Sequence, residues 1–274
     1  MTTTAIAPTP LEKARALWAL GDYSAVAHEV IPSMGPVVVA AADIRPGQRV
    51  IDVAAGAGNA ALPAARIGAQ VVATDITPEL LAVGRSEAER AGLDITWMEA
   101  DAQALPLEDN EFDVALSTVG VMFAPDHQAC AHELVRVVRP GGTIAIANWT
   151  PSGFVGQMLG TLKPYLPPPP AGARPGVLWG DEDHVRELFG DRVVSLAAET
   201  RVITVTCFRH PDEFRDFFKH NYGPTVAAYR TLAGDPDRAV ELDRDLSALA
   251  ARSHLGGDGL TMQWEYLLVT ARVV

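Results

Sequence analysis

Short apolar runs alternate with amphipathic stretches through the middle of the chain. The runs are rich in Val and Ile or bounded by Gly, Pro and Asp, which is typical of strands buried on both faces of a sheet. Strands are expected at residues 49–54, 70–75, 95–99, 113–118 and 143–149. Helical patterns lie between them, and this alternation favours a parallel sheet covered by helices.

Two of the intervening helices have boundaries that the sequence indicates directly. A helix is expected over 127–139, and the run Pro140-Gly141-Gly142 predicts its end. Its apolar face is formed by Cys130, Leu134, Val137 and Val138. Thr77-Pro78 predicts the start of another helix, with Thr77 as the N-cap, and Gly92 predicts its end.

Segments on both sides of this central region add further elements. A helical extension is expected at 9–41, and the Pro-rich run 165–176 predicts a loop or hinge because proline disrupts helix and sheet interiors. Two more strands are expected at 201–208 and 262–274. The excursion between them contains helical patterns and is long for a connection, so we interpret 209–260 as an inserted helical cap.

Composition and charge exclude several classes of protein. With 48% hydrophobic and 20% charged residues, the chain is expected to be compact and globular. The formal net charge of -12 disfavours nucleic acid as a partner, because phosphate binding needs a basic face. A basic region followed by an apolar stretch does not open the sequence, and no run of roughly 18 apolar residues occurs, so we expect a cytoplasmic protein without membrane insertion.

Cysteine and histidine give no sign of a metal centre. Cys130 and Cys207 are too few for a disulfide framework and lack zinc spacing, and both are expected to be buried thiols. No cluster of His and carboxylate residues has ligand spacing, so no metal is expected.

The glycine-rich run VIDVAAGAGNAAL at 50–62 is the most informative stretch. Small residues there let the backbone pass close to a ligand, and the helix that opens near Asn59 offers unpaired N–H donors. Residues 56–61 satisfy the GxGxxG/A dinucleotide fingerprint, and Asp75 follows at a distance suited to holding a ribose. A nicotinamide or flavin enzyme therefore has to be considered.

Three acidic residues at successive strand ends favour a different ligand. Asp52 would repel a pyrophosphate beside the loop but attract an ammonium or sulfonium. Asp75 fits two ribose hydroxyls, and Asp101 fits the amino group of an adenine. Together they suit a cationic adenosyl ligand. Asp52 can also be a buried acid bonded to backbone amides, and Asp75 and Asp101 can be turn or cap residues.

At these residues the chain resembles the class I S-adenosylmethionine-dependent methyltransferases, in particular the small-molecule branch related to the ubiquinone and menaquinone C-methyltransferases. The resemblance rests on five motifs in order: VIDVAAGAGN (50–59), VVATDITPELL (71–81), EADAQALPLEDNEFD (99–113), STVGVMFAPD (117–126) and LVRVVRPGGTIAIANWTP (134–151). The W-x-x-G-D-Y segment at 18–23 is similar to one in bacterial methyltransferases whose substrates are mostly unassigned.

The resemblance implies one methyltransferase domain over 1–274 with an α/β, Rossmann-like fold. A seven-stranded, mostly parallel sheet with the last strand antiparallel is expected, with helices on both faces. The S-adenosylmethionine-binding core would span 42–150. The extension at 9–41 and the cap at 209–260 would form a helical lid.

The resemblance also implies S-adenosyl-L-methionine as the cofactor and S-adenosyl-L-homocysteine as the product. Asp52 and the loop Ala54–Gly58 would follow the methionine moiety, with Gly56 and Gly58 allowing close approach; Ala54 stands where the family usually has Gly. Asp75 would bind the ribose hydroxyls, and Thr118 would face the sulfonium and the methyl group. The adenine would be contacted by Ile76, Asp101, Ala102 and Gln103. Thr118 can also be an ordinary β-former.

The acceptor is expected to be a small, apolar or aromatic metabolite, methylated on O, N or C. The apolar residues Val119, Val121, Met122 and Phe123 follow the fourth strand, beside the expected methyl-donor end, and no motif for extruded DNA bases is present. His127 and His220 are candidate catalytic bases, although His127 can equally cap a helix. Phe218, Asn221 and Tyr222 are candidates for the substrate pocket or for ordinary cap core.

Two other functions stay open, an NAD(P)-dependent oxidoreductase and a non-catalytic S-adenosylmethionine-binding relative. The protein is expected to be a monomer or a homodimer.

Overall fold

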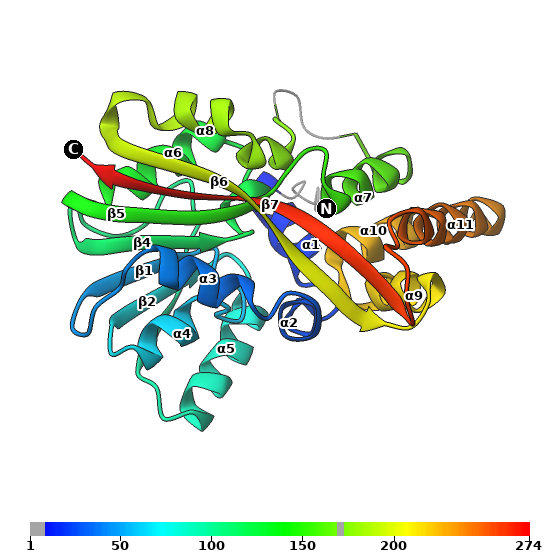
Figure 1. Ribbon diagram of the computed structural model, residues 1–274, viewed down its shortest axis with the longest axis horizontal. Helices are drawn as coiled ribbons and strands as arrows, with labels where there is room; N and C mark the ends of the chain where they lie inside the picture. The colour runs from blue at the N-terminus through cyan, green and yellow to red at the C-terminus, as the bar shows by residue number, and fades with distance from the viewer. Residues whose placement is uncertain (1–8, 169–172) are drawn as a thin grey trace, which may run out of the picture.

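The computed structural model describes residues 9–168 and 173–274, and its centre is one seven-stranded sheet. The strand order is β3-β2-β1-β4-β5-β7-β6 (Figure 1). Its members are β1 (Arg49–Val53), β2 (Gln70–Asp75), β3 (Ile95–Glu99), β4 (Phe112–Thr118), β5 (Val138–Trp149), β6 (Val193–Phe208) and β7 (Leu260–Val273). Strands β1 to β5 pair in parallel and β7 is antiparallel to both of its neighbours, which confirms the expected fold.

Helices cover both faces of the parallel part of the sheet (Figure 1). On one side lie α3 (Met34–Ala41), α4 (Ala61–Arg66) and α5 (Pro78–Arg90), and on the other α6 (His127–Arg136) and α8 (Glu182–Phe189). Val50, Ile51 and Ala115 have no exposed surface. This explains why the strands read as continuous apolar runs rather than alternating ones.

The helix boundaries follow the sequence signals with one correction. α5 begins directly after Thr77, and Gly92 beyond its end has a φ of 65°. α6 ends at Arg136, whereas the sequence analysis extends it to residue 139. The prediction was wrong there because Val138 already pairs with Phe112 at the start of β5. Val138 is buried in the strand, and a buried apolar residue fits a helix as well as a strand, so its residue type did not show where the helix ends.

The N-terminal segment is a chain of short helices that leads to the sheet. It contains α1 (Pro10–Trp18), α2 (Tyr23–Ala25) and a π-helical turn η1 (Val26–Val30) before α3. Thr9 and Glu12 form a capping box at the start of α1, and Asp22 caps α2. At the turn between them Gly21 has a φ of 73°, and a Cβ there would lie 2.6 Å from the Asn221 oxygen.

Among the described residues no single helix is long and apolar enough to cross a membrane. The two segments Tyr23–Val30 and Met34–Ala41 reach the length and composition only as a pair bent by 74°.

The second half of the chain adds the antiparallel strands and the remaining helices. Short helices α7 (Phe154–Leu162), η3 (Lys163–Tyr165) and η4 (Gly176–Gly180) follow β5, and η5 (Gly190–Arg192) precedes β6. The expected loop at 165–176 falls partly on residues 169–172, which lie outside the described residues. Strand β6 begins at Val193, eight residues before the expected strand, because exposed polar positions interrupt its apolar pattern.

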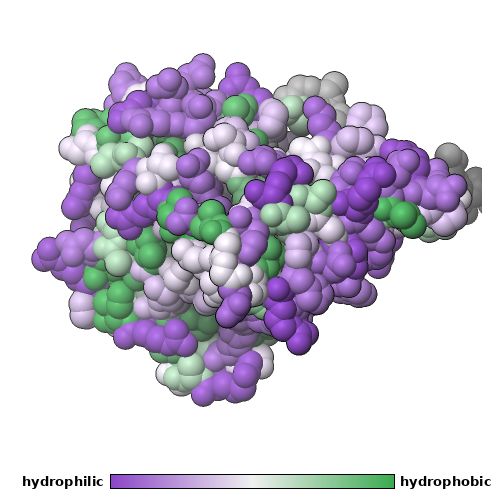
Figure 2. All heavy atoms as spheres, turned by 45° about the vertical axis from the view of Figure 1, so that its right-hand side comes forward, coloured by the Kyte–Doolittle hydropathy of each residue, from purple (hydrophilic) through white to green (hydrophobic). Residues whose placement is uncertain are grey.

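Three helices lie between β6 and β7, in the segment for which the sequence predicts a cap. They are α9 (Pro211–Asn221), α10 (Gly223–Thr231) and α11 (Pro236–Arg252). An aromatic cluster of Phe154, Phe208, Phe214, Phe218 and Trp264 joins α9 to strands β6 and β7 and to α7. The outer surface of these helices is largely hydrophilic, as the right-hand projection in Figure 2 shows.

The two cysteines differ in environment. Cys130 is buried in α6, as expected, whereas Cys207 is exposed, and the prediction for it was wrong. β6 is one of the two edge strands of the sheet, so a residue that reads as part of an apolar run can still face solvent.

Candidate functional site

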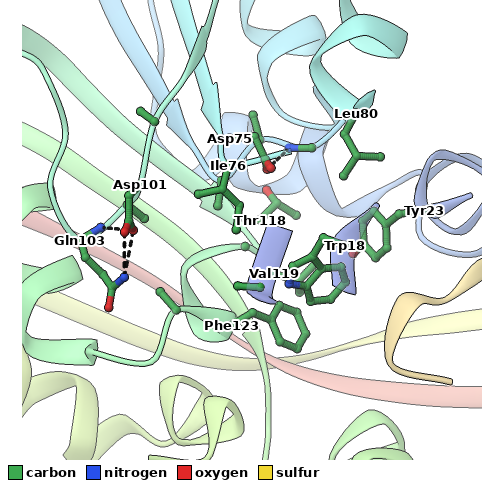
Figure 3. Close-up of a pocket in the computed structure, with 18 of the residues that line it drawn as sticks. Trp18, Tyr23, Asp75, Ile76, Leu80, Asp101, Gln103, Thr118, Val119 and Phe123 are labelled. Atoms are coloured by element: carbon green, nitrogen blue, oxygen red, sulfur yellow. Dashed lines mark hydrogen bonds between the residues drawn. The ribbon is translucent and has the colours of Figure 1, made fainter. Parts of the chain in front are cut away.

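A cavity lies at the carboxyl ends of β1 to β4, where the parallel strands converge. It holds about 960 Å³ of space not filled by atoms, its open mouth included. Ala54, Asp75, Asp101 and Thr118, each at or directly after one of these strands, line it. Figure 3 shows Asp75, Asp101 and Thr118 around this cavity. Ligand sites of open parallel sheets are typically found at this edge.

The glycine loop turns sharply between β1 and α4. Ala54, Gly56 and Gly58 have φ values of 54°, 55° and 91°. Ala54 and Gly56 line the cavity, whereas Gly58 packs against Trp97, whose ring would lie 2.7 Å from a Cβ at that position. Gly58 thus allows the loop to pack against β3, and the loop residues before it face the cavity.

Asp75 fastens the glycine loop to the end of β2. Its Oδ2 accepts a hydrogen bond of 2.9 Å from the Gly56 N–H, and its Oδ1 accepts one of 2.8 Å from the Thr77 N–H. Burial raises the pKa of Asp75, and the backbone donors oppose this. A carboxylate has about four acceptor positions, so Asp75 retains capacity for further donors on the cavity side.

Asp52 lies beneath the loop rather than on the cavity wall. The side chain is 1% exposed, its Oδ2 accepts a 2.8 Å hydrogen bond from the Ala61 N–H, and its Oδ1 has no partner. Burial raises the pKa of Asp52 to about 7, with a further contribution from the negative charge of Asp75. Its charge therefore depends on pH and on whatever occupies the loop.

Asp101 and Gln103 form a pair at the end of β3. The Gln103 N–H donates to Asp101 Oδ1 at 2.9 Å, and Gln103 Nε2 donates to both carboxylate oxygens at 3.0 Å (Figure 3). Gln103 Oε1 accepts from the Asp126 N–H at 3.0 Å, which ties the pair to the start of α6. Ala102 lines the cavity between them.

The end of β4 combines an unsatisfied hydroxyl with backbone strain. Thr118 Oγ1 is buried and has no hydrogen-bond partner, although the residue lines the cavity. Val119 follows with a φ of 47°, which is rare for a β-branched residue. A Cβ at Gly120 would lie 2.4 Å from the Ala54 oxygen. The ends of β1 and β4 thus meet at two strained residues, Ala54 and Val119, a pattern associated with ligand sites.

Aromatic side chains from distant segments close the cavity opposite the strand ends (Figure 3). The Trp18 ring centroid lies 4.6 Å from that of Phe123 and 5.6 Å from that of Tyr23, the latter at 88°. Tyr222 lies behind them, 5.9 Å from Trp18. Burial and the charge of Asp75 raise the pKa of Tyr23, which therefore stays neutral.

The structure brings most expected cofactor residues together but not the expected catalytic and acceptor residues. The cavity is lined by Ala54, Gly56, Asp75, Ile76, Asp101, Ala102, Gln103 and Thr118 from the expected set. The residues of that set that do not line it are Asp52, Gly58, Met122, His127, Phe218, His220, Asn221 and Tyr222.

His127 is buried in a contact between helices and does not line the cavity. Its Nδ1 lies 3.0 Å from His184 Nε2, and the ring contacts Trp179. Burial, with the charges of His184 and Arg174, lowers the pKa of His127 to about 4. It does not cap α6 either, because Asp126 is the N-cap and accepts from the Ala129 N–H.

The other residues outside the cavity have structural surroundings. His220 is exposed, with its Nδ1 2.6 Å from the Asp216 carbonyl oxygen. Met122 is fully buried, and Phe218 packs against Phe214 in the aromatic cluster described above. Asn221 Nδ2 donates to the Phe217 carbonyl.

Phe123 was expected beside the methyl-donor end, but spacing along the chain did not predict that it forms one aromatic wall with Trp18 and Tyr23. The W-x-x-G-D-Y segment and the aromatic residue in STVGVMF were visible signals. No local pattern shows that residues about a hundred positions apart meet in space, so the contact could not be read from sequence spacing.

The chain is similar in sequence to a methyltransferase family and to bacterial proteins. Residues 51–146 match the family described as methyltransferase domain. An uncharacterized protein of Mycobacterium tuberculosis (strain H37Rv) is 50% identical over 271 residues, covering 99% of this chain and 98% of the relative. The demethylmenaquinone methyltransferase of Thermus thermophilus is 38% identical over 106 residues, covering 38% of this chain and 48% of that protein.

A solved structure shares the fold. Phosphoethanolamine N-methyltransferase 2 of Haemonchus contortus, in complex with S-adenosyl-L-methionine, superposes with a TM-score of 0.54 at 16% sequence identity. The superposition covers 87% of this chain and 52% of that one.

Proposed function

Because the chain belongs to the class I S-adenosylmethionine-dependent methyltransferases, we propose that its strand-end cavity binds S-adenosyl-L-methionine and that it methylates a small apolar or aromatic metabolite. The observation that carries the proposal is the convergence of Asp75, Asp101 and the glycine loop on one cavity. In this arrangement two carboxylates and the backbone of the glycine loop line the same cavity.

The polar residues fit an adenosyl group. Asp75 retains acceptor capacity for ribose hydroxyls after binding two backbone N–H groups. Asp101 is oriented by Gln103 and can accept from an adenine amino group, and Ile76 lines the cavity beside Asp75. Ala102 supplies further lining between the two acids.

The sulfonium end fits the loop and the end of β4. The strained Ala54 carries a methyl group into the cavity wall where a glycine would leave space. Thr118 lines the cavity, and its buried Oγ1 has no hydrogen-bond partner, so we assign this residue to the methyl end of the cofactor. Asp52 beneath the loop places a titratable negative charge near the cationic centre.

When bound, the cofactor supplies a methyl group on an already activated carbon. The protein then has to hold the acceptor in line with that group and keep water out. Trp18, Tyr23 and Phe123 provide an apolar, aromatic wall for both tasks. No His, Lys, Arg or Cys lines the described part of the cavity, so the proposal gives no base role to His127 or His220.

An NAD(P)-dependent oxidoreductase is the alternative that the glycine fingerprint supports. Asp52 and Asp75 place two carboxylates next to the loop that would hold a pyrophosphate. That arrangement repels a dianionic ligand and favours a cationic one.

Isothermal titration calorimetry with S-adenosylhomocysteine and with NADH distinguishes the two cofactors. We expect binding of S-adenosylhomocysteine and no measurable heat from NADH. Binding of NADH alone would contradict the proposal.

Methyl transfer is tested by a metabolite screen with S-adenosylmethionine labelled in its methyl group. The His220→Ala variant serves as a control that should retain activity, because the His220 side chain is exposed and the residue does not line the cavity. If the protein binds the cofactor but methylates no acceptor, the non-catalytic alternative is favoured.

A further inference from the structure

Strand β6 forms an open edge of the sheet. In the described part of the chain β6 pairs only with β7, and it is the terminal strand of the sheet (Figure 1). Nine of its sixteen residues are exposed, and Val202 keeps 51% of its surface. An edge strand presents a row of backbone N–H and C=O groups that can pair with another chain.

The edge carries few of the devices that normally prevent such pairing. The segment Val193–Phe208 contains no Lys and no Pro. Near its start, Ser195 has a φ of 54° at a register shift, and Arg186 donates to the Leu196 carbonyl. These features prevent the first residues of β6 from pairing with another chain. From Ala197 to Val205 the strand pairs regularly with β7, so its outer edge is regular too.

The charges of this stretch are self-complementary. Glu199 and Arg201 are its only charged residues and form an ion pair of 2.7 Å, with side-chain exposures of 62% and 39%. When two copies of one strand pair antiparallel about a two-fold axis, the axis passes midway between the two copies of one residue, which lie directly opposite each other, because outward-facing backbone groups alternate along the strand. An axis at Thr200 places Glu199 of each copy opposite Arg201 of the other, so two pairs of opposite charges form.

Neighbouring registers are worse. An axis at Glu199 or at Arg201 brings like charges directly opposite each other, which destabilises a ladder. The axis at Thr200 also places Val202 opposite Ala198 and Ile203 opposite Ala197 of the second copy. Apolar residues then meet apolar residues, and the four charges form an alternating group.

We propose that β6 is a homodimer interface, in which two copies pair antiparallel about Thr200 and their sheets become continuous. Such a contact is isologous, because the same patch serves both copies. Two strands, β5 and β7, separate β6 from β4, the nearest strand that lines the cavity, so both cavities stay accessible.

Charge reversal tests the interface. We expect sedimentation velocity of the full chain to show a species of twice the 29.2 kDa chain mass at micromolar concentration. Glu199→Arg or Arg201→Glu alone should raise the dimer dissociation constant about tenfold or more, because attraction becomes repulsion at two positions. The double variant Glu199→Arg/Arg201→Glu restores opposite charges and should restore the dimer.

The control is Glu89→Arg, an equal change of charge at an exposed position of α5 on the far side of the sheet. It should leave the dimer intact. Circular dichroism of each variant separates a lost interface from a lost fold. A monomer at all concentrations, or a dimer unaffected by the single reversals, would overturn the proposal.

Cross-linking tests the register. In a Cys207→Ser background, Thr200→Cys places two thiols opposite each other across the axis, within disulfide reach. Val202→Cys places the thiol opposite Ala198 and should not cross-link to itself. Equal cross-linking of both variants, or none with Thr200→Cys, would overturn the Thr200 register.

Discussion

The two walls of the cavity are built in different ways. The strand-end wall consists of acids and a glycine loop, and backbone hydrogen bonds such as Gly56 N–H to Asp75 fix its geometry. The opposite wall consists of Trp18, Tyr23 and Phe123, which ring contacts hold in place. The first wall gives directional recognition and the second gives apolar area. Cofactor binding and acceptor choice are therefore expected to respond to different mutations.

The largest effect is expected at Asp75. Asp75→Ala removes the carboxylate proposed to accept from the ribose hydroxyls and also the anchor of the glycine loop. Hydrogen bonds to a charged group contribute about 1.5–3 kcal/mol each, so the loss of two should lower affinity for S-adenosylhomocysteine roughly a hundredfold or more. Calorimetry measures this directly.

A matched control is available at the other end of the same sheet. Asp113 also accepts a backbone N–H, that of Arg49 at 2.7 Å, but it does not line the cavity. Asp113→Ala should leave cofactor affinity within about twofold while lowering stability. Equal losses of affinity in both variants would mean that the strand-end wall acts only through the fold.

Trp18→Ala is expected to have the next largest effect, on the opposite wall. Truncating an aromatic side chain at the centre of a contact costs about 2 kcal/mol, so the KM for the acceptor found in the screen should rise roughly thirtyfold. Affinity for S-adenosylhomocysteine should change much less. Trp18→Phe keeps an aromatic ring and should retain most of the acceptor binding. If Trp18→Ala instead reduced cofactor binding as strongly as Asp75→Ala, the division between the walls would be wrong.

The pH dependence of cofactor choice tests Asp52 beneath the strand-end wall. Burial raises the pKa of Asp52 to about 7, so the carboxylate ionises as pH rises from 6 to 8. S-adenosylmethionine carries a positive sulfonium, and S-adenosylhomocysteine has a neutral thioether. The ratio of their affinities should therefore shift about threefold or more toward S-adenosylmethionine over this range.

Ionisation of Asp52 is expected to change the free energy of unfolding in the opposite direction, lowering it as pH rises. Because the folded pKa lies above the unfolded value of about 3.9, the folded state binds the proton more tightly. The stabilisation is complete below about pH 4 and is lost as pH rises through about 7. Asp52→Asn should flatten both the affinity ratio and this part of the stability profile. A ratio that stays pH-dependent in the variant would assign the effect to another group.

The smallest effect is expected at the strained loop residue. Ala54 has a φ of 54°, a conformation that costs an L-residue about 1–2 kcal/mol, whereas glycine adopts it freely. After the greater entropy of glycine in the unfolded chain is subtracted, Ala54→Gly should stabilise the protein by about 0.5 kcal/mol in urea unfolding. Ala57→Gly, in the same loop without a positive φ, should destabilise it. A destabilised Ala54→Gly variant would indicate that the methyl contact outweighs the strain.

The sequence predicted the strand-end wall better than the aromatic wall for a physical reason. Asp75, Asp101 and the glycine loop occur at fixed offsets from strand ends, and a parallel sheet brings those ends together. Trp18 and Phe123 meet only through tertiary packing, which spacing along the chain does not encode.

Residue type alone was ambiguous at several other positions. Met122 and Phe218 are apolar residues near the site in sequence, and such residues fit a core as well as a pocket; both are in the core. His127 follows the fourth strand closely, yet its neighbour is His184, a residue from another helix. The first half of β6 was missed because an edge strand keeps exposed polar residues.

The place where the helices α9 to α11 enter and leave the sheet has an evolutionary consequence. Phe208 and Leu260 are paired neighbours on β6 and β7, so the chain departs from and returns to almost the same point (Figure 1). An insertion at such a point can lengthen, shrink or be replaced while the strands beneath it keep their register. Replacement of these helices would also leave the described cavity lining intact, because none of its residues comes from α9, α10 or α11.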